Sequence, residues 1–172
     1  MDTIVWILIL LTAFNFLLKQ TFWKPVAVGA AAGIAAIFVI LMWPYAIEQS
    51  KTQIADWLSD NQLMLDTSVV LTLEIVLQMA FCLLAVHVAN YSPVKKRMML
   101  AYRLLYWFPG VLIIPVLFFG LTQAVFSFPG VSFKLIAWFF GAFVFVIIPL
   151  GRWLIKWLLP EEDLRLELFF LT

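Results

Sequence analysis

Residues 104–134 read LLYWFPGVLIIPVLFFGLTQAVFSFPGVSFK, and the tetrapeptide FPGV occurs in this stretch twice, at 108–111 and 128–131. The two copies begin 20 residues apart. Twenty residues of α-helix rise about 30 Å, which is the thickness of the hydrocarbon core of a bilayer. The two copies could be an internal repeat, a binding motif, or markers of the two ends of one membrane-spanning helix.

The composition of the whole chain is that of a membrane protein. Its 172 residues are 65% apolar and 12% charged, and the mean hydropathy is +1.06. Soluble domains are closer to half apolar and a quarter charged. Because so little polar surface cannot cover a water-facing globule, we expect a single all-α integral membrane domain that has the lipid bilayer as its solvent. The net charge of +1 gives no indication of a nucleic-acid partner.

Five apolar runs predict about five transmembrane helices. The first run starts after an acidic residue and is followed by its bases, the reverse of a cleaved signal peptide, so we expect it to be retained. The fourth run has two possible starts, because Pro109 either kinks a helix that has already begun or begins the helix itself. The predicted spans are 3–18, 25–46, 67–89, 104–122 or 109–128, and 131–150.

The distribution of basic residues predicts the orientation in the membrane. With five alternating spans, nine of the 11 lysines and arginines fall on one side, and only Lys51 and Lys134 fall on the other. Such an excess marks the cytoplasmic side. We therefore expect the N-terminus outside and the C-terminus inside. The basic loop 90–103 and the tail 158–172 then lie inside, and the loop 48–66 lies outside.

Two segments outside the spans carry patterns of their own. In the outer loop, apolar residues at partly helical spacing predict a short helix that lies on the membrane surface. In the tail, Pro160 and the three acids after it favour a helix start, whereas the alternation L-R-L-E-L suits a strand equally well. The sequence leaves the type of this amphipathic C-terminal element open.

Glu74 is the outstanding ionisable residue within the predicted spans. A lone carboxylate in a membrane is costly, so it is expected to be protonated, paired, or in contact with water or a partner. Gln78 follows one helical turn later on the same face. The pair either forms part of a path for protons or cations, or hydrogen-bonds a neighbouring helix.

His87 and Cys82 are the only residues of their types in the chain. His87 lies about 140° around the helix from Glu74, so the two cannot share one site on a straight helix. His87 could be an axial haem ligand or a proton relay, and the simpler alternative is a histidine at the membrane interface whose hydrogen bonds are satisfied. Cys82 lies in an apolar run, where we expect a small hydrophobic residue. A single cysteine excludes an intrachain disulfide and a cysteine-based metal cluster.

Several other residues are candidates for contacts rather than chemistry. Gly29 and Gly33 form a GxxxG pattern that permits close helix packing. Pro109 and Pro129 mark the points where the chain enters the membrane or kinks. Contacts with lipid or a partner are predicted for the basic cluster and for the apolar tail, which are Lys95, Lys96, Arg97, Arg103, Leu168, Phe169 and Phe170.

The segments FPG…FPGVSF and LPEEDLRLELFFL resemble a family of small multi-pass bacterial membrane proteins. In that family the protein accompanies an ExbB/TolQ-like proton channel and a cobaltochelatase-like subunit in haem or tetrapyrrole uptake systems. The resemblance implies such partners, a link to the proton motive force, and haem in the complex. It supplies no catalytic residues for this chain.

Two functions follow as expectations. The first is a non-catalytic accessory or scaffolding subunit of an inner-membrane complex, because the chain has few polar groups in its spans and contains none of the sequence motifs of hydrolases, nucleotide-binding enzymes or metalloproteases. No cofactor is expected in the chain alone. The second is a small transporter or channel component with a proton or cation path at Glu74 and Gln78.

Overall fold

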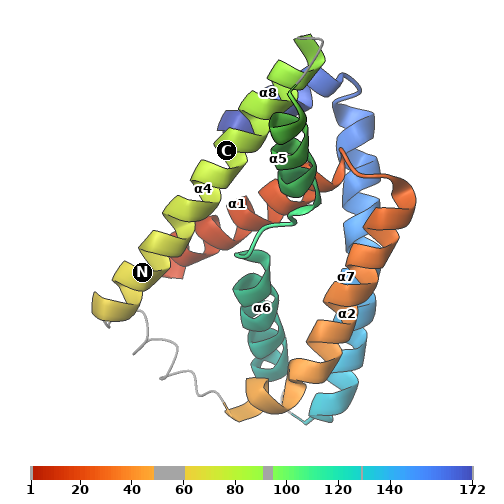
Figure 1. The fold of residues 1–172 in the computed structure, drawn as a ribbon. Coiled ribbons are helices and arrows are strands. Elements are labelled where there is room, and N and C mark those ends of the chain that lie inside the picture. Colours follow the sequence, from red (N-terminus) through yellow and green to blue (C-terminus); the bar gives the residue numbers. More distant parts are fainter. Residues whose placement is uncertain (1, 49–60, 91–94, 129, 172) are drawn as a thin grey trace.

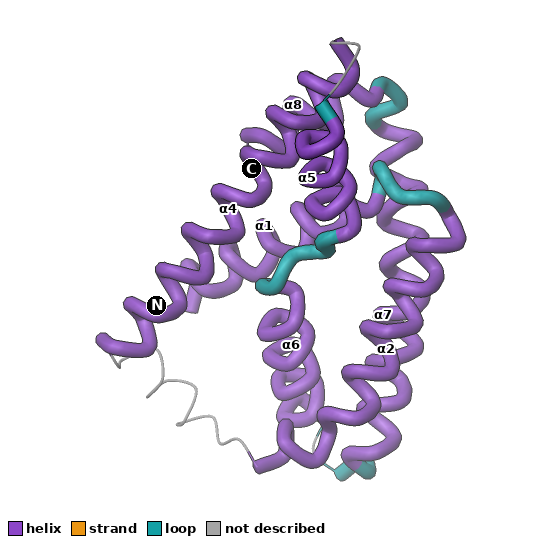
Figure 2. Tube along the Cα trace, in the orientation of Figure 1, coloured by secondary structure: helices purple, strands orange, loops and turns teal. Residues whose placement is uncertain are grey.

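The computed structural model describes residues 2–48, 61–90, 95–128 and 130–171, and within these ranges every regular element is a helix (Figures 1 and 2). The all-helical fold expected from the sequence is therefore confirmed for the described residues. The seven helices are α1 (Asp2–Gln20), α2 (Pro25–Glu48), α4 (Asn61–Asn90), α5 (Lys96–Trp107), α6 (Ile113–Ser127), α7 (Phe133–Leu158) and α8 (Glu162–Leu171).

Three of these helices are long and apolar enough to cross a membrane, namely α2, α7 and the Ser68–Asn90 part of α4. Two further helices are apolar but shorter, the Trp6–Gln20 part of α1 and the whole of α6. At 1.5 Å per residue, the 15 residues of α6 rise about 22 Å, less than the hydrocarbon core. The fourth apolar run is thus divided between α5 and α6, and its second helix begins at Ile113, after Pro109 rather than at it.

Two hydrophobic clusters hold the helices together. The larger joins α2, α6 and α7 through residues such as Val39, Val125 and Val144. The smaller joins α1, α4 and α8 through Leu18, Phe81, Cys82 and Phe169, with α5 packed against it. Because α1 contributes Phe16 to the first cluster and Leu18 to the second, it connects the two halves of the fold.

Small residues allow α2 and α7 to pack closely, but not the ones that the GxxxG pattern indicates. A Cβ atom on Gly29 or Gly33 would meet nothing within 4 Å, so neither makes a close helix contact among the described residues. The close approach is instead at Gly141 of α7, where a Cβ would lie 3.3 Å from the carbonyl oxygen of Ala36 on α2. The prediction of a GxxxG contact within the chain is therefore not met.

The C-terminal element, whose type the sequence left open, is the helix α8. Tertiary packing explains why this element is a helix and not a strand. A helix places Leu166 and Phe169 on one face, against the cluster that contains Phe81 and Cys82. Two acids in its first turn favour the N-terminal end of the helix dipole. Arg165 donates from Nη1 to the carbonyl oxygens of Leu159 (2.7 Å) and Pro160 (2.9 Å), which covers the C-terminal end of α7.

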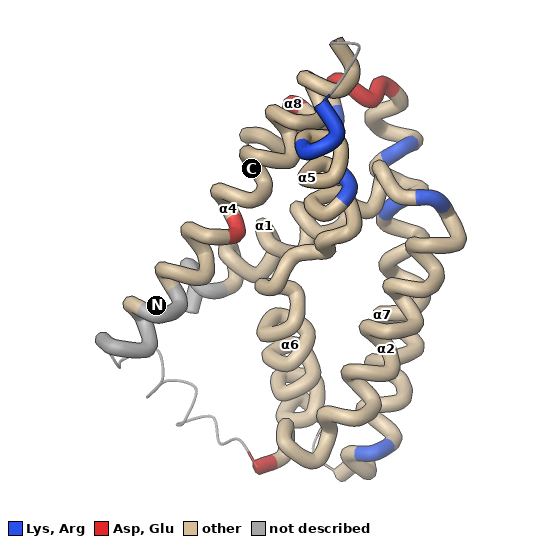
Figure 3. The backbone as a smooth tube through the Cα atoms, in the orientation of Figure 1, with Lys and Arg blue, Asp and Glu red and all other residues tan. Residues whose placement is uncertain are grey.

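Basic residues gather at one end of the molecule. Figure 3 shows the blue segments of α5 and of the last turns of α7 at the same end, and the basic residue at the start of α7 at the opposite end. The predicted outer interfacial helix, with Ile54, Trp57, Leu58 and Leu65, falls mainly on residues 49–60, which lie outside the described ranges; Leu65 itself is on α4 and exposed.

Candidate functional site

Both copies of FPGV are turns between helices. The first copy follows the end of α5 at Trp107, and the second follows the end of α6 at Ser127. The glycines adopt nearly the same left-handed conformation, with φ of +101° at Gly110 and +99° at Gly130. Glycine adopts this conformation without the steric strain that other residues incur. Pro109 lies in the first turn, whereas Pro129 lies outside the described residues.

The two turns differ in the partner of the valine that ends the tetrapeptide. In the second copy, the backbone N–H of Val131 donates within the turn to the carbonyl oxygen of Phe128 (3.4 Å). In the first copy, the backbone N–H of Val111 donates to Oε2 of Glu74 (3.0 Å). The N–H of Leu112 donates to the same oxygen (2.8 Å). Glu74 on α4 therefore caps the turn that begins α6.

The Glu74 carboxylate also approaches the glycine of this turn. A Cβ atom built on Gly110 would lie 2.6 Å from Oε1 of Glu74, too close for any real contact. The positive φ favours glycine at position 110, and a larger residue there would in addition displace the Glu74 carboxylate from its present position. A negative charge at the N-terminal end of a helix is favourable because unpaired N–H groups and the helix dipole are concentrated there.

Gln78, one turn after Glu74, connects three helices. Its Nε2 donates to Oδ1 of Asn15 on α1 (3.2 Å) and to the backbone carbonyl oxygen of Phe169 on α8. The shared face of Glu74 and Gln78, inferred from their spacing, is the face that α4 turns toward the rest of the chain. Both side chains are engaged in hydrogen bonds between helices.

Lys19 is buried beside this pair, which the sequence did not indicate. It is 6% exposed, and its Nζ lies 3.9 Å from the ring centroid of Phe81 and 5.3 Å from that of Phe169. An ammonium over aromatic faces is stabilised by the negative charge density of the rings. We refer to Asn15, Lys19, Glu74 and Gln78 as the polar joint.

The polar joint encloses little space. All four of its residues line one cavity of about 30 Å³. This volume accommodates about one or two water molecules. It does not accommodate a haem or another organic cofactor, whose sites are about 300 Å³ or larger. The arrangement can fix the relative positions of α1, α4, α6 and α8, and as it stands it forms no binding site for a cofactor.

His87 does not line the cavity of the polar joint. It lies partly buried in the last turn of α4, at the end of the helix opposite to Asn61. Within the described ranges, no three His, Cys, Asp or Glu side chains come together in a way that could hold a metal ion. Cys82 is buried, and its Sγ lies 3.9 Å from the carbonyl oxygen of Leu166.

Only some of the residues predicted to contact a partner or lipid are exposed. Lys95, Lys96, Arg97 and Arg103 are all exposed at the end of the molecule where α5 begins. In the apolar tail, Phe170 is 44% exposed, but Phe169 is only 4% exposed because it packs against Phe81. Leu168 is partly buried in the same cluster. The expectation that Phe169 needs an external partner is therefore wrong, since α1 and α4 cover it.

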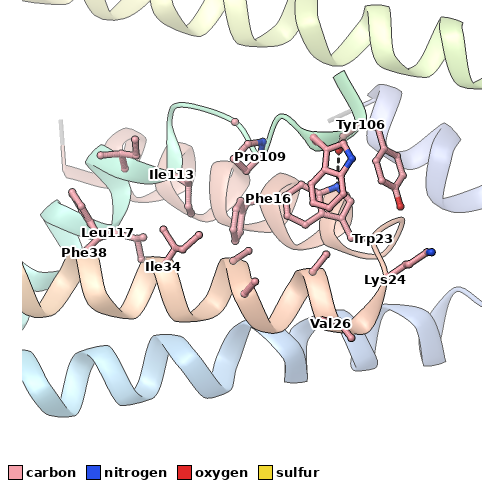
Figure 4. Close-up of a pocket in the computed structure, with 17 residues that line it drawn as sticks. Phe16, Trp23, Lys24, Val26, Ile34, Phe38, Tyr106, Pro109, Ile113 and Leu117 are labelled. Atoms are coloured by element: carbon pink, nitrogen blue, oxygen red, sulfur yellow. Dashed lines mark hydrogen bonds between the residues drawn. The ribbon is translucent and has the colours of Figure 1, made fainter. Parts of the chain in front are cut away.

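A long apolar groove runs between α2 and the segment formed by α1, the first FPGV turn and α6 (Figure 4). Its volume is about 770 Å³. At one end the indole Nε1 of Trp23 donates to the carbonyl oxygen of Tyr106 (2.6 Å), and the Tyr106 hydroxyl donates to that of Phe22 (2.8 Å).

No family model matches the chain, and the comparisons with curated proteins and with solved structures give no similar protein. The family resemblance of the two FPG segments and the tail thus stays a prediction.

Proposed function

We propose that the chain is a non-catalytic accessory subunit that holds together a larger complex in the bacterial inner membrane. The observation that carries this proposal is the exposed surface of the first half of the Ser68–Asn90 span of α4. From Ser68 to Ala80 no side chain of α4 is buried, although this segment belongs to a helix of membrane-spanning length. In Figure 1 this half of α4 lies apart from α2 and α7.

The exposed side chains of this half are mainly large and apolar, among them Val69, Leu73, Val76 and Met79. Helices in a membrane associate through close van der Waals packing and interhelical hydrogen bonds. A partner helix against α4 would add packing that the chain itself does not provide there. The opposite face of α4 is held by Glu74 and Gln78, so the helix can present its apolar face in a fixed direction.

The hydrogen bonds of the polar joint favour this function over a transport path. Glu74 accepts two backbone N–H groups, and Gln78 bonds to α1 and α8. A carboxylate that carries protons or cations must exchange its partners during each cycle, which here would release the start of α6. We therefore assign Glu74 and Gln78 a positioning role, and keep the path as the alternative.

The proposed arrangement has five crossings with the N-terminus outside and the C-terminus inside. The end of the molecule that carries the basic segments of α5 and α7 would face the cytoplasm, in agreement with the positive-inside rule. The exposed cluster Lys95, Lys96, Arg97 and Arg103 would then contact anionic lipid or an acidic segment of a partner. An ExbB/TolQ-like channel and a chelatase-like subunit of a haem or tetrapyrrole uptake system are the partners that the family resemblance suggests.

Purification from the native membrane in a mild detergent tests the proposal. A tagged chain expressed at its natural level should elute with other membrane proteins at constant stoichiometry. A homogeneous homo-oligomer that moves a substrate into liposomes would contradict the accessory function. Glu74→Gln decides the alternative, because a path through the carboxylate predicts loss of transport by intact cells, whereas a positioning role predicts that the protein still assembles and functions.

A further inference from the structure

The groove between α2 and α6 has the shape of a site for one extended hydrocarbon chain. It follows α2 from Lys24 to Phe38, a distance of about 20 Å at 1.5 Å per residue (Figure 4). This length exceeds half of the bilayer's hydrocarbon core, the depth that the acyl chains of one leaflet occupy. Two residues of the groove, Val26 and Ile34, are largely exposed, so it opens to the surroundings of the protein.

Alanines on α2 create the space. Ala27, Ala30, Ala31 and Ala35 line the groove at positions where larger residues would fill it. The small-residue string VGAAAGIAA at 28–36, which contains Gly29 and Gly33, therefore contributes to this groove as well as to the contact with α7. Pro109, Gly110 and Leu117 form part of the opposite side.

The lining is unsuited to water. Most of its residues are aliphatic or aromatic, and the polar side chains of Trp23, Lys24 and Tyr106 lie at one end (Figure 4). Trp107 belongs to the same end, because its ring centroid lies 5.8 Å from that of Trp23. Apolar cavities do not retain water, and an empty space of 770 Å³ would deprive its lining of dispersion contacts. An apolar occupant is therefore favoured over water and over an empty groove.

The polar end matches an anionic headgroup. Among the described residues that line the groove, Lys24 is the only charged one. Arg152 lies next to it, where Nη2 donates to the carbonyl oxygen of Trp23 (3.0 Å) and Nε to that of Gln20 (3.2 Å). Trp23, Tyr106 and Trp107 gather at the same end, and tryptophan and tyrosine favour the headgroup level of a membrane.

We propose that this groove binds one anionic phospholipid of the bilayer. An acyl chain lies along the alanines of α2, and the phosphate contacts the ammonium group of Lys24. The lipid would fill the space between α2 and the first FPGV turn, and so would stabilise the packing of α6 against α2. The site uses none of the residues of the polar joint and does not depend on the accessory function.

Lipid retention measured by native mass spectrometry tests the proposal. The full chain is purified in a mild detergent and incubated with micelles that contain phosphatidylglycerol and phosphatidylcholine with the same acyl chains. The wild type should retain one phosphatidylglycerol per chain. Ala31→Phe should abolish retention of both lipids, because the phenyl ring occupies the groove. Ile34→Trp should do the same from an exposed position, which guards against a folding defect of the first variant.

The headgroup contact is tested separately. Lys24→Gln should lower the preference for phosphatidylglycerol about fivefold, the effect of one basic residue on binding to an anionic lipid surface. The control Lys134→Gln, at the opposite end of the molecule, should leave the preference unchanged. Equal retention by the wild type and Ile34→Trp would overturn the proposal. So would a photo-crosslinking residue at position 34 that captures a protein in native membranes instead of a lipid.

Discussion

Glu74 accepts a 2.8 Å hydrogen bond from the backbone N–H of Leu112, although the two residues are 38 positions apart in the chain. The bond joins the middle of α4 to the start of α6, and Val111 donates a second one to the same oxygen. Glu74, which stands out in the sequence as a candidate for proton transfer, thus caps the start of α6. The carboxylate thus links the first FPGV turn to α4 by two hydrogen bonds.

Removal of the Glu74 carboxylate should destabilise the protein. Glu74→Ala leaves two N–H groups without their acceptor, and we expect a loss of about 1–3 kcal/mol in the free energy of unfolding. Glu74→Gln keeps a carbonyl oxygen at the same place and loses only the negative charge at the start of α6. It should therefore lower the free energy of unfolding by less, about 0.3–1 kcal/mol. Unfolding in detergent, followed by circular dichroism, measures both.

The matched control for these variants is Glu167→Ala, since Glu167 is exposed on α8. It should change the unfolding transition very little. If Glu74→Ala were as mild as Glu167→Ala, the carboxylate would not hold the turn.

Alanine substitution in the two FPGV turns should give unequal results. Both glycines have a positive φ, so each substitution costs about 1–2 kcal/mol in backbone strain. Gly110→Ala also forces the new Cβ against Glu74, whereas Gly130→Ala meets nothing within 4 Å. We therefore expect Gly110→Ala to be the more destabilising of the two in the same unfolding measurement.

A double-mutant cycle isolates the contact. In the background of Glu74→Ala, the cost of Gly110→Ala should fall to that of Gly130→Ala, because the clashing oxygens are gone. Strict additivity of the two changes would contradict the contact between Glu74 and Gly110.

The adjacent residues Phe169 and Phe170 should also respond differently. Phe169 packs against Phe81 and the Lys19 ammonium group, so Phe169→Ala is expected to cost about 3–5 kcal/mol. Phe170 is largely on the surface, and Phe170→Ala should cost less than about 1 kcal/mol. Similar losses in the two variants would show that α8 does not dock on α1 and α4 in this way.

Periodicity and composition predicted the helical fold because the apolar runs are long. The sequence left two starts open for the fourth run, and Pro109 marked the place where the structure divides it into α5 and α6. It could not indicate that Glu74, on a distant helix, binds the turn at this division. The tail was ambiguous for a related reason. The pattern L-R-L-E-L fits a helix and a strand, and contacts with Phe81 and Cys82 on α4 favour the helix.

The candidate site was predicted in part. The spacing of Glu74 and Gln78 correctly placed them on one face, but their partners on α1, α6 and α8 follow from tertiary structure alone. Lys19 and Lys24 both follow the first apolar run, and no local signal distinguishes the buried Lys19 from the exposed Lys24. Gly29 and Gly33 satisfy a packing pattern without making the contact, because α7 approaches α2 at Ala36 instead.

The orientation can be measured by cysteine labelling in a Cys82→Ser background. Lys96→Cys, on the exposed start of α5, should react with a membrane-impermeant maleimide only after the cells are permeabilised. Val131→Cys, at the exposed last residue of the second FPGV turn, should react in intact cells. Labelling of Lys96→Cys in intact cells would contradict a cytoplasmic location of the basic cluster.

The central claim is that the first half of α4 binds another membrane subunit. Photo-crosslinking in native membranes tests it most directly, with a photoreactive residue in place of Leu73 or Val76 on α4 and, as control, in place of Phe139 on the exposed face of α7. The accessory function predicts one defined protein adduct from the α4 positions, with a partner that also co-purifies at constant stoichiometry, and lipid adducts from position 139. Lipid adducts alone at all three positions would contradict it.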